Sequence, residues 1–122
     1  MALQSAIINV MKQAARKASV RLKRDYGEVD QLQVSQKGPS DFVTAADIRT
    51  ERILKEELSR ARPNFGFLME EEGEVKGHNS NCRWIVDPID GTTNFVHGIA
   101  HFAICIALEE LGQITAGLIL DP

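Results

Sequence analysis

The chain has 122 residues, a length that allows one compact domain. Its hydrophobic content of 43% and charged content of 25% are ordinary for a globular protein. The formal net charge of −3 argues against a protein that holds nucleic acid by its phosphate backbone, so we expect no nucleic-acid partner. Polar residues from Asn9 onward interrupt the first apolar run, and no stretch approaches membrane-spanning length. We therefore expect a cytoplasmic protein without a membrane partner.

The N-terminal segment has the pattern of an amphipathic helix. No glycine or proline occurs before Gly27, which predicts one long helix that ends near this glycine. The apolar residues at helical spacing are Leu3, Ile7, Val10, Met11, Ala14, Ala18 and Leu22. The other faces are rich in lysine and arginine; a solvated surface is the favoured interpretation, and a partner or RNA surface is the less favoured one. Residues 29–35 alternate weakly, which indicates a short edge strand.

A second helix is predicted to follow the loop at residues 37–40. The segment from Thr44 to Asp47 fits a capping box, so the helix should begin there and run to about residue 61. Taken alone, Asp47 is a helix cap worth ~1 kcal/mol. A carboxylate fixed at the start of a helix also has a defined geometry, so the cap is compatible with a second role in a site.

Two short apolar runs each end in acidic residues. Phe65–Met69 is followed by Glu70 and Glu71, and the run at residues 84–86 is followed by Asp87. If both runs are strands of one sheet and point in the same direction, their acids emerge at one edge. Repulsion among these carboxylates is costly without bound cations, so the pattern predicts a metal site. The intervening segment, residues 71–82, is expected to be a loop with at most one helical turn.

The stretch at residues 87–95 combines two kinds of binding group. Asp87 and Asp90 lie three residues apart on a stiff turn, with the carbonyl of Ile89 between them, and the proline at position 88 should end the strand. Gly91 then frees the backbone before small polar residues that start helices. Carboxylate and carbonyl oxygens suit magnesium, and free amides at a helix start suit a phosphate. A lone Asp-Pro-x-Asp-Gly motif is more often a plain turn.

The last part of the chain predicts a hairpin, with a strand at residues 101–109, a connection at 111–113 and an antiparallel return at 114–120. Large residues of the first strand alternate with small ones, and we expect the small side to pack closely against the helices. The large residues are Phe102, Ile104, Ile106 and Leu108, and the small ones are Ala103, Cys105 and Ala107. Helices followed by mostly antiparallel strands indicate an α+β fold.

These motifs together resemble a known family. The stretch Asp87-Pro88-Ile89-Asp90-Gly91-Thr92-Thr93-Asn94-Phe95, with Glu70-Glu71 and Asp41-Phe42-Val43-Thr44-Ala45-Ala46-Asp47 upstream, resembles the signature of the inositol monophosphatase family, the magnesium-dependent, lithium-sensitive phosphatases. The resemblance implies two long helices packed on a mostly antiparallel twisted sheet, the N-terminal half of an αβαβα layered sandwich.

The resemblance also implies that residues 1–122 form an N-terminal metal-binding domain and that a C-terminal domain is absent from this chain. Family members are longer, and their second half carries a Trp-Asp motif that completes the second metal site. The only tryptophan here is Trp84, so this chain lacks that motif. We expect the isolated 122 residues to have little or no activity.

The implied reaction is hydrolysis of a phosphate monoester by a water molecule that two or three Mg²⁺ ions activate. The implied metal ligands are Glu70, Asp87, the carbonyl of Ile89, and Asp90. Catalytic roles fall to Glu70 and to Asp47 with Thr92, which would orient the attacking water. Substrate contacts fall to Glu70, Ile89, Asp90, Gly91 and Thr92, while Glu71 and Lys37 would support the site from just outside the ligands.

The implied substrate is a small phosphorylated molecule such as myo-inositol monophosphate, and the implied assembly is a homodimer. Two alternatives stay open. One keeps the chemistry and changes the substrate to a sugar phosphate or a nucleotide bisphosphate. The other is a non-catalytic interaction protein that retains the fold and docks through the basic faces of the first helix. The intact set of acids argues against the second alternative, because a lapsed enzyme has no need of them.

Overall fold

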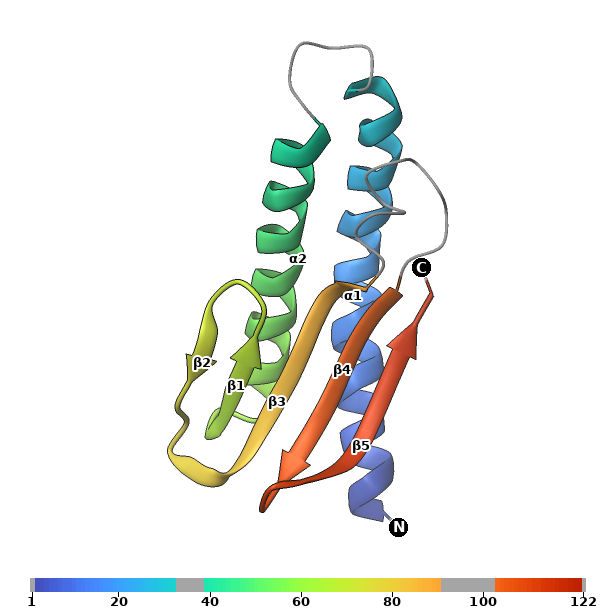
Figure 1. The fold of residues 1–122 in the computed structure, drawn as a ribbon. Helices are drawn as coiled ribbons and strands as arrows, with labels where there is room; N and C mark the ends of the chain where they lie inside the picture. The colour runs from blue at the N-terminus through green and yellow to red at the C-terminus, as the bar shows by residue number, and fades with distance from the viewer. Residues whose placement is uncertain (1, 33–38, 91–102, 122) are drawn as a thin grey trace.

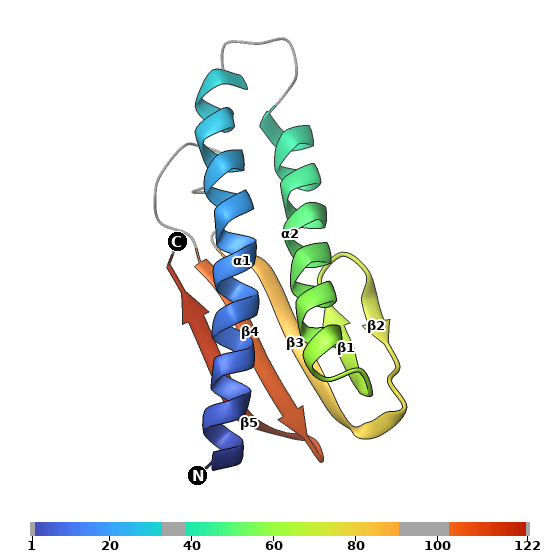
Figure 2. The same cartoon turned by 180° about the vertical axis from the view of Figure 1, so that it is seen from behind.

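The computed structural model describes residues 2–32, 39–90 and 103–121; the side chains of residues 2–5, 28–32, 39–44 and 90 are outside the description. The elements are α1 (Ala2–Leu32), α2 (Pro39–Ala61), β1 (Phe65–Met69), β2 (Gly73–Val75), β3 (Asn79–Asp90), β4 (Ala103–Glu110) and β5 (Gln113–Leu120). The strands form one sheet in the order β2-β1-β3-β4-β5. Both helices cover the same face of this sheet, which gives two layers (Figure 1 and Figure 2).

α1 is longer than the sequence pattern predicted. It continues past Gly27 to Leu32, so the predicted edge strand is wrong for residues 29–32, and residues 33–35 lie outside the description. A single exposed glycine costs a helix only about 1 kcal/mol, and no proline occurs before Pro39 to stop it. The predicted apolar stripe is confirmed for Met11, Ala14, Ala18 and Leu22, which are at most 1% exposed. Ile7 and Val10 are half-buried, and the side chain of Leu3 lies outside the description.

α2 begins earlier than predicted. It starts at Pro39 rather than at Thr44, because proline in the first turn of a helix has no amide to lose and its φ is already helical. The capping-box interpretation is therefore wrong, and Asp47 lies inside the helix, about two turns from its start. The end of the helix at Ala61 agrees with the prediction.

Ion pairs tie α1 to α2. Asp25 is 0% exposed, and its Oδ1 lies 3.0 Å from Arg49 Nη2 and 3.4 Å from Arg21 Nε. Elsewhere between the two helices, Lys17 Nζ of α1 lies 2.6 Å from Glu57 Oε1 of α2. A buried carboxylate is tolerated only with such partners, so Asp25 restricts how the two helices lie against each other.

β1 pairs antiparallel with β2 and parallel with β3. The predicted strand at Phe65–Met69 is confirmed, but residues 71–82 are not a loop with a helical turn, because they contain β2 and the start of β3. Gly73, with φ +79°, closes the three-residue turn between β1 and β2. β3 also runs further than predicted, through Pro88 to Asp90. Its register with β4 shifts between Asp87 and Asp90, an irregularity at which a proline is tolerated.

β4 and β5 form the predicted antiparallel hairpin. The alternation along β4 is confirmed, but the predicted facing is wrong. The large residues are at most 1% exposed in the core under the helices, whereas the small residues are half-buried on the opposite face. Burying large branched side chains removes more apolar area from water, and this decides which face of the strand meets the core. The buried residues are Ile104, Ile106 and Leu108, and Phe102, the fourth large residue of the predicted strand, lies outside the described residues.

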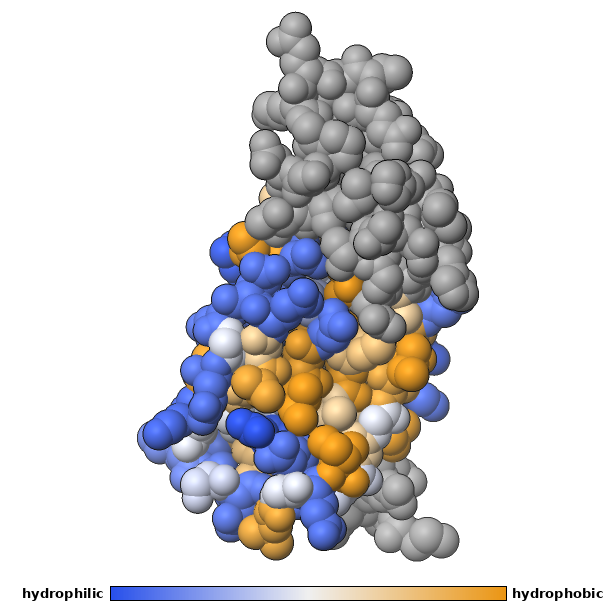
Figure 3. Space-filling view, viewed as in Figure 1, coloured by the Kyte–Doolittle hydropathy of each residue, from blue (hydrophilic) through white to orange (hydrophobic). Residues whose placement is uncertain are grey.

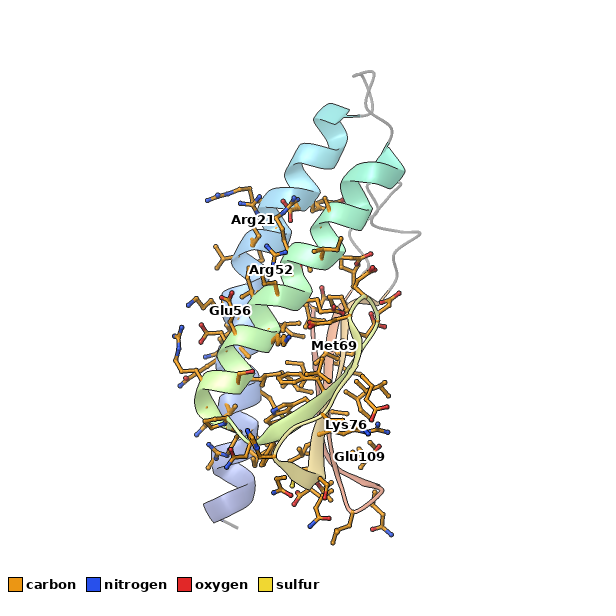
Figure 4. All side chains as sticks on the ribbon, turned by 90° about the vertical axis from the view of Figure 1, so that its left-hand side faces the viewer. Arg21, Arg52, Glu56, Met69, Lys76 and Glu109 are labelled. Atoms are coloured by element: carbon orange, nitrogen blue, oxygen red, sulfur yellow. The ribbon has the colours of Figure 1, made fainter. Side chains whose placement is uncertain are left out.

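The core lies between the helices and the sheet. Trp84 of β3 is fully buried there, and its ring centroid lies 5.6 Å from that of Phe65. Figure 4 shows Met69 near the helices, with Lys76 and Glu109 on the other side of the sheet. Within the described ranges, neither helix combines the length and the apolar character needed to cross a membrane.

The face of the sheet opposite the helices is not covered by any described element. Figure 3 shows an apolar area in the middle of this face, with hydrophilic side chains along its left and lower sides. Leu68 and Ile119 are 36% and 75% exposed, and the register places Ile85 between Leu68 and Ala107. A contiguous apolar area of this kind is typical of a surface that another layer or partner covers.

Gly77 lies where the chain passes from β2 to β3 against the start of β1. A Cβ atom there would lie 2.6 Å from the amide nitrogen of Gly66 and would also overlap the backbone of Asn64 and Phe65. We expect Gly77→Ala to lower the free energy of unfolding by about 1–3 kcal/mol, because backbone atoms cannot move aside cheaply. Gly117→Ala is the matched control, since nothing lies within 4 Å of the added Cβ. Urea unfolding of the whole protein measures both, and equal midpoints for the two variants would contradict the close packing.

Candidate active site

The parallel pairing of β1 with β3 brings two predicted site residues together. Met69 lies opposite Val86, so Glu70 and Asp87 follow at the same edge of the sheet, and the condition set for their meeting, one sheet with both strands in the same direction, is met. Burial raises the pKa of Glu70, and the charge of Asp87 and a hydrogen bond with Asp87 raise it further. The two side chains therefore lie close enough to influence each other's ionisation.

Asp47 approaches this pair from α2. It is 6% exposed, and burial, followed by the charges of Glu70 and Glu71, raises its pKa from 3.8 to about 7. The charges of Asp87 and Glu51 act in the same direction. These five residues, Asp47, Glu51, Glu70, Glu71 and Asp87, are called the acidic cluster below.

Two oxygens of the acidic cluster have no hydrogen-bond partner among the described residues. Asp47 Oδ1 and Asp87 Oδ1 are both closed to solvent. A buried polar atom without a partner is costly, and a hard divalent cation such as Mg²⁺ is the group that relieves several carboxylates at once. The donor set therefore fits such a cation. It is not complete within the described ranges, because no three His, Cys, Asp or Glu side chains there are grouped so that they could hold a metal ion.

The end of β3 carries two further predicted ligands. Ile89 follows Asp87 by two residues, and its side chain is 1% exposed in the core, which anchors this segment. Asp90 pairs with Ala103 of β4, but its side chain is outside the description. The ligand roles of the Ile89 carbonyl and the Asp90 carboxylate therefore stay predictions.

Three predicted site residues, Lys37, Gly91 and Thr92, lie outside the described residues. Their predicted roles are untested by the structure. The predicted site residues that the structure brings together are Asp47, Glu70, Glu71 and Asp87.

Sequence reasoning missed Glu51. This residue of α2 is 4% exposed, and its Oε1 and Oε2 accept the backbone amides of Glu71 and Glu72, each at 3.0 Å. A signal for its burial was present, because Glu51 precedes Leu54 and Leu58 at helical spacing and so falls in the apolar stripe of the helix.

The family of the chain follows from comparison with known sequences. A family model described as the inositol monophosphatase family matches residues 3–122. This chain belongs to the inositol monophosphatase family. The resemblance drawn from the three sequence motifs is thus confirmed.

Other members of the inositol monophosphatase family are similar over nearly the whole chain. It is 61% identical to an inositol-1-monophosphatase of Mesorhizobium japonicum over 98% of this chain and 45% of the relative. It is 35% identical to the Nus factor SuhB of Escherichia coli K12 over 95% of this chain and 43% of the relative. The crystal structure of the extragenic suppressor protein suhB from Bartonella henselae matches 96% of this chain and 44% of that one, with 54% identity and a TM-score of 0.83. The chain spans less than half the length of these relatives, and the likeness confirms the predicted fold of two helices on a mostly antiparallel sheet.

The raised pKa of Asp47 makes the stability of the metal-free protein depend on pH. Between about pH 4 and about pH 7 the unfolded chain loses the proton of Asp47 while the folded chain keeps it, so the free energy of unfolding falls as pH rises and levels off above this window. Asp47→Asn removes this titration, so it should flatten the slope and stabilise the metal-free protein above pH 7 by about 1–2 kcal/mol. Urea unfolding in EDTA across this range measures the effect.

Glu56→Gln, an exposed position on the same helix, is the control and should keep the wild-type slope. An unchanged slope in Asp47→Asn would show that Asp47 is ionised in the folded chain well below neutral pH.

Proposed function

We propose that the whole protein hydrolyses a phosphate monoester in a magnesium-dependent reaction, with myo-inositol monophosphate as the favoured substrate. The observation that carries this proposal is the acidic cluster at the shared edge of β1 and β3, where Glu70 and Asp87 meet and carboxylate oxygens lack donors. Family membership and the 61% identity to a protein named inositol-1-monophosphatase support it. The direct test is the rate of phosphate release from this ester with and without Mg²⁺. An equal rate under both conditions would contradict the proposal.

The residues proposed to hold Mg²⁺ are Glu70, Asp87, the carbonyl of Ile89, and Asp90. When bound, the ions would neutralise these carboxylates, polarise the phosphoryl group and make a water molecule a better nucleophile. Glu71 and Lys37 would support the ligands from outside. The fit of a hard cation to the acidic cluster supports this assignment, since Asp87 Oδ1 is buried without a partner among the described residues.

Asp47 and Thr92 are proposed to orient the attacking water. Asp47 Oδ1 is closed to solvent and accepts no hydrogen bond from a described residue, so it has an acceptor to offer to a water proton. Because Asp47 lies inside α2 rather than at its start, the helix restricts its position from both sides. The amides of Gly91 and Thr92 would bind the phosphate, and Asp90 would accept a hydrogen bond from a substrate hydroxyl.

The alternative substrates are a sugar phosphate and a nucleotide bisphosphate. The residues of the acidic cluster act on the phosphate, which all three esters share, so they do not separate these substrates. Values of kcat/KM for the three esters, measured on the whole protein, decide among them. A preference for a nucleotide bisphosphate would change the substrate and keep the proposed chemistry.

A second candidate function, a non-catalytic interaction role, is favoured by one observation. A relative of 35% identity is named Nus factor SuhB. The surface available for such a role is the exposed basic side of α1, with Lys12, Arg16, Lys23 and Arg24. The acidic cluster favours the enzyme. A folded whole protein without turnover on any of the three esters would favour the second candidate.

We also propose that residues 1–122 are the N-terminal metal-binding domain of a longer enzyme and have little activity alone. The longer enzyme would be cytoplasmic, sensitive to lithium and a homodimer. Two observations support the domain assignment: the chain covers 45% of the Mesorhizobium relative, and the apolar area around Leu68 and Ile119 is uncovered. Turnover of the 122-residue chain compared with that of the whole protein tests it.

Asp87→Asn should lower magnesium-dependent turnover of the whole protein more than about a hundredfold, because it removes the negative charge of a proposed Mg²⁺ ligand. Phosphate release at saturating Mg²⁺ measures this loss. Glu74→Gln removes the same charge from an exposed position of β2 and should leave turnover unchanged. Wild-type turnover in Asp87→Asn would remove Asp87 from the proposed ligands.

Thr92→Ala should lower kcat about a hundredfold while the affinity for Mg²⁺ stays close to the wild-type value, because the proposed work of its hydroxyl is on the attacking water. The two quantities are separated by measuring kcat and the Mg²⁺ concentration that gives half-maximal rate. A variant with wild-type kcat and weakened Mg²⁺ binding would reassign Thr92 to the metal.

A further inference from the structure

The turn between β1 and β2 carries three glutamates and is held in place by a fourth. Glu70 to Glu72 form the whole turn, since Met69 pairs with Gly73 across it. From α2, the buried Glu51 reaches this turn and accepts the amide of Glu71 at Oε1 and the amide of Glu72 at Oε2, each at 3.0 Å. Two adjacent amides of the turn are therefore clamped to one side chain of the helix.

A carboxylate suits this clamp better than other side chains do. It has two equivalent acceptor oxygens, whereas glutamine has one acceptor oxygen and an amide group that donates. Its negative charge is unfavourable in this place, because it acts on Asp47 and Glu70 in the same direction as the other acids of the cluster. The carboxylate of Glu51 therefore adds repulsion among the acids of the site, and in return it fixes the turn between β1 and β2.

Lys55, one turn after Glu51 on α2, holds the far end of the same turn. Its Nζ lies 2.7 Å and 2.9 Å from the two carboxylate oxygens of Glu72. The third glutamate is thus drawn to the helix by a cation, while Glu70 remains beside Asp87. Two side chains of one helix therefore set both the backbone of the turn and the direction of its last acid.

We propose that Glu51 is a positioning residue, whose carboxylate fixes the β1–β2 turn so that Glu70 stays beside Asp87 in the arrangement that takes a divalent cation. This inference rests on the proposed metal site and assigns that site a supporting residue in α2. Glu51 acts through the amides of Glu71 and Glu72 and does not itself contact the cation or the substrate.

Two variants separate geometry from charge. Glu51→Asp keeps the charge but is one methylene shorter, so it cannot reach both amides from the same backbone position. Glu51→Gln keeps the length and loses the charge and one acceptor. Glu56→Gln and Glu56→Asp repeat both changes at an exposed position of the same helix as controls.

Two measurements on the whole protein read out the clamp and the site separately. Amide hydrogen exchange of Glu71 and Glu72, followed by NMR in EDTA, reports the clamp without any metal. Calorimetric titration with Mn²⁺ reports the site without turnover. We expect both Glu51 variants to speed exchange of the two amides and to weaken Mn²⁺ binding about tenfold or more, while both Glu56 variants match the wild type.

Three results would overturn the proposal. Wild-type Mn²⁺ affinity in Glu51→Asp, with loss only in Glu51→Gln, would show that Glu51 acts by charge alone. Faster exchange with unchanged Mn²⁺ affinity in both variants would show a structural clamp without a role in the site. A wild-type protein that binds no Mn²⁺ would overturn the proposed function and the positioning role together. The first two results, in contrast, would overturn the positioning role and leave the proposed function standing. If Glu51→Gln does not fold, the amide exchange and the Mn²⁺ affinity of Glu51→Asp test the proposal alone.

Discussion

The site depends on the parallel pairing of β1 with β3. Because the carboxyl ends of both strands meet at one edge, Glu70 and Asp87 lie together as soon as the strands pair. Parallel neighbours are usually joined by a long crossover with a helix. Here the chain leaves β1 through β2 and returns past the start of β1, where Gly77 packs on backbone atoms with no side chain between (Figure 1). This close packing at Gly77 lets a short connection return the chain to pair β3 with β1, and the pairing brings the two carboxylates together.

The acidic edge could be predicted from the sequence because its signals are local. An apolar run that stops at an acid marks a strand end, and two such runs need only a shared direction to bring Glu70 and Asp87 together. The helix ends were predicted less well. The signals at Gly27 and Thr44 are each worth about 1 kcal/mol, which the packing of a long amphipathic helix outweighs. Asp47 was expected to cap the start of α2, and that local role is wrong, although the structure does place this residue near the other acids.

Other features could not be predicted because they are set by tertiary contacts. A period of two tells which residues of β4 share a face, but the face that meets the helices is decided by the area that each face buries. The clamp of Glu51 joins residues 20 and 21 positions apart, so no local pattern reveals its partners. Only its place in the apolar stripe of α2 indicated that this acid is buried.

Charge balance links the fold to its proposed chemistry. Two basic residues of α2 that could neutralise the acidic cluster are engaged elsewhere, since Arg49 pairs with Asp25 and Lys55 with Glu72. Burial, and after it the charges of the neighbouring acids, raise the pKa values of Asp47 and Glu70. A cation bound beside these carboxyl groups favours their ionised forms, so its affinity should rise with pH as they lose protons. The raised pKa values and the proposed affinity for a cation are thus two consequences of one arrangement of carboxylates.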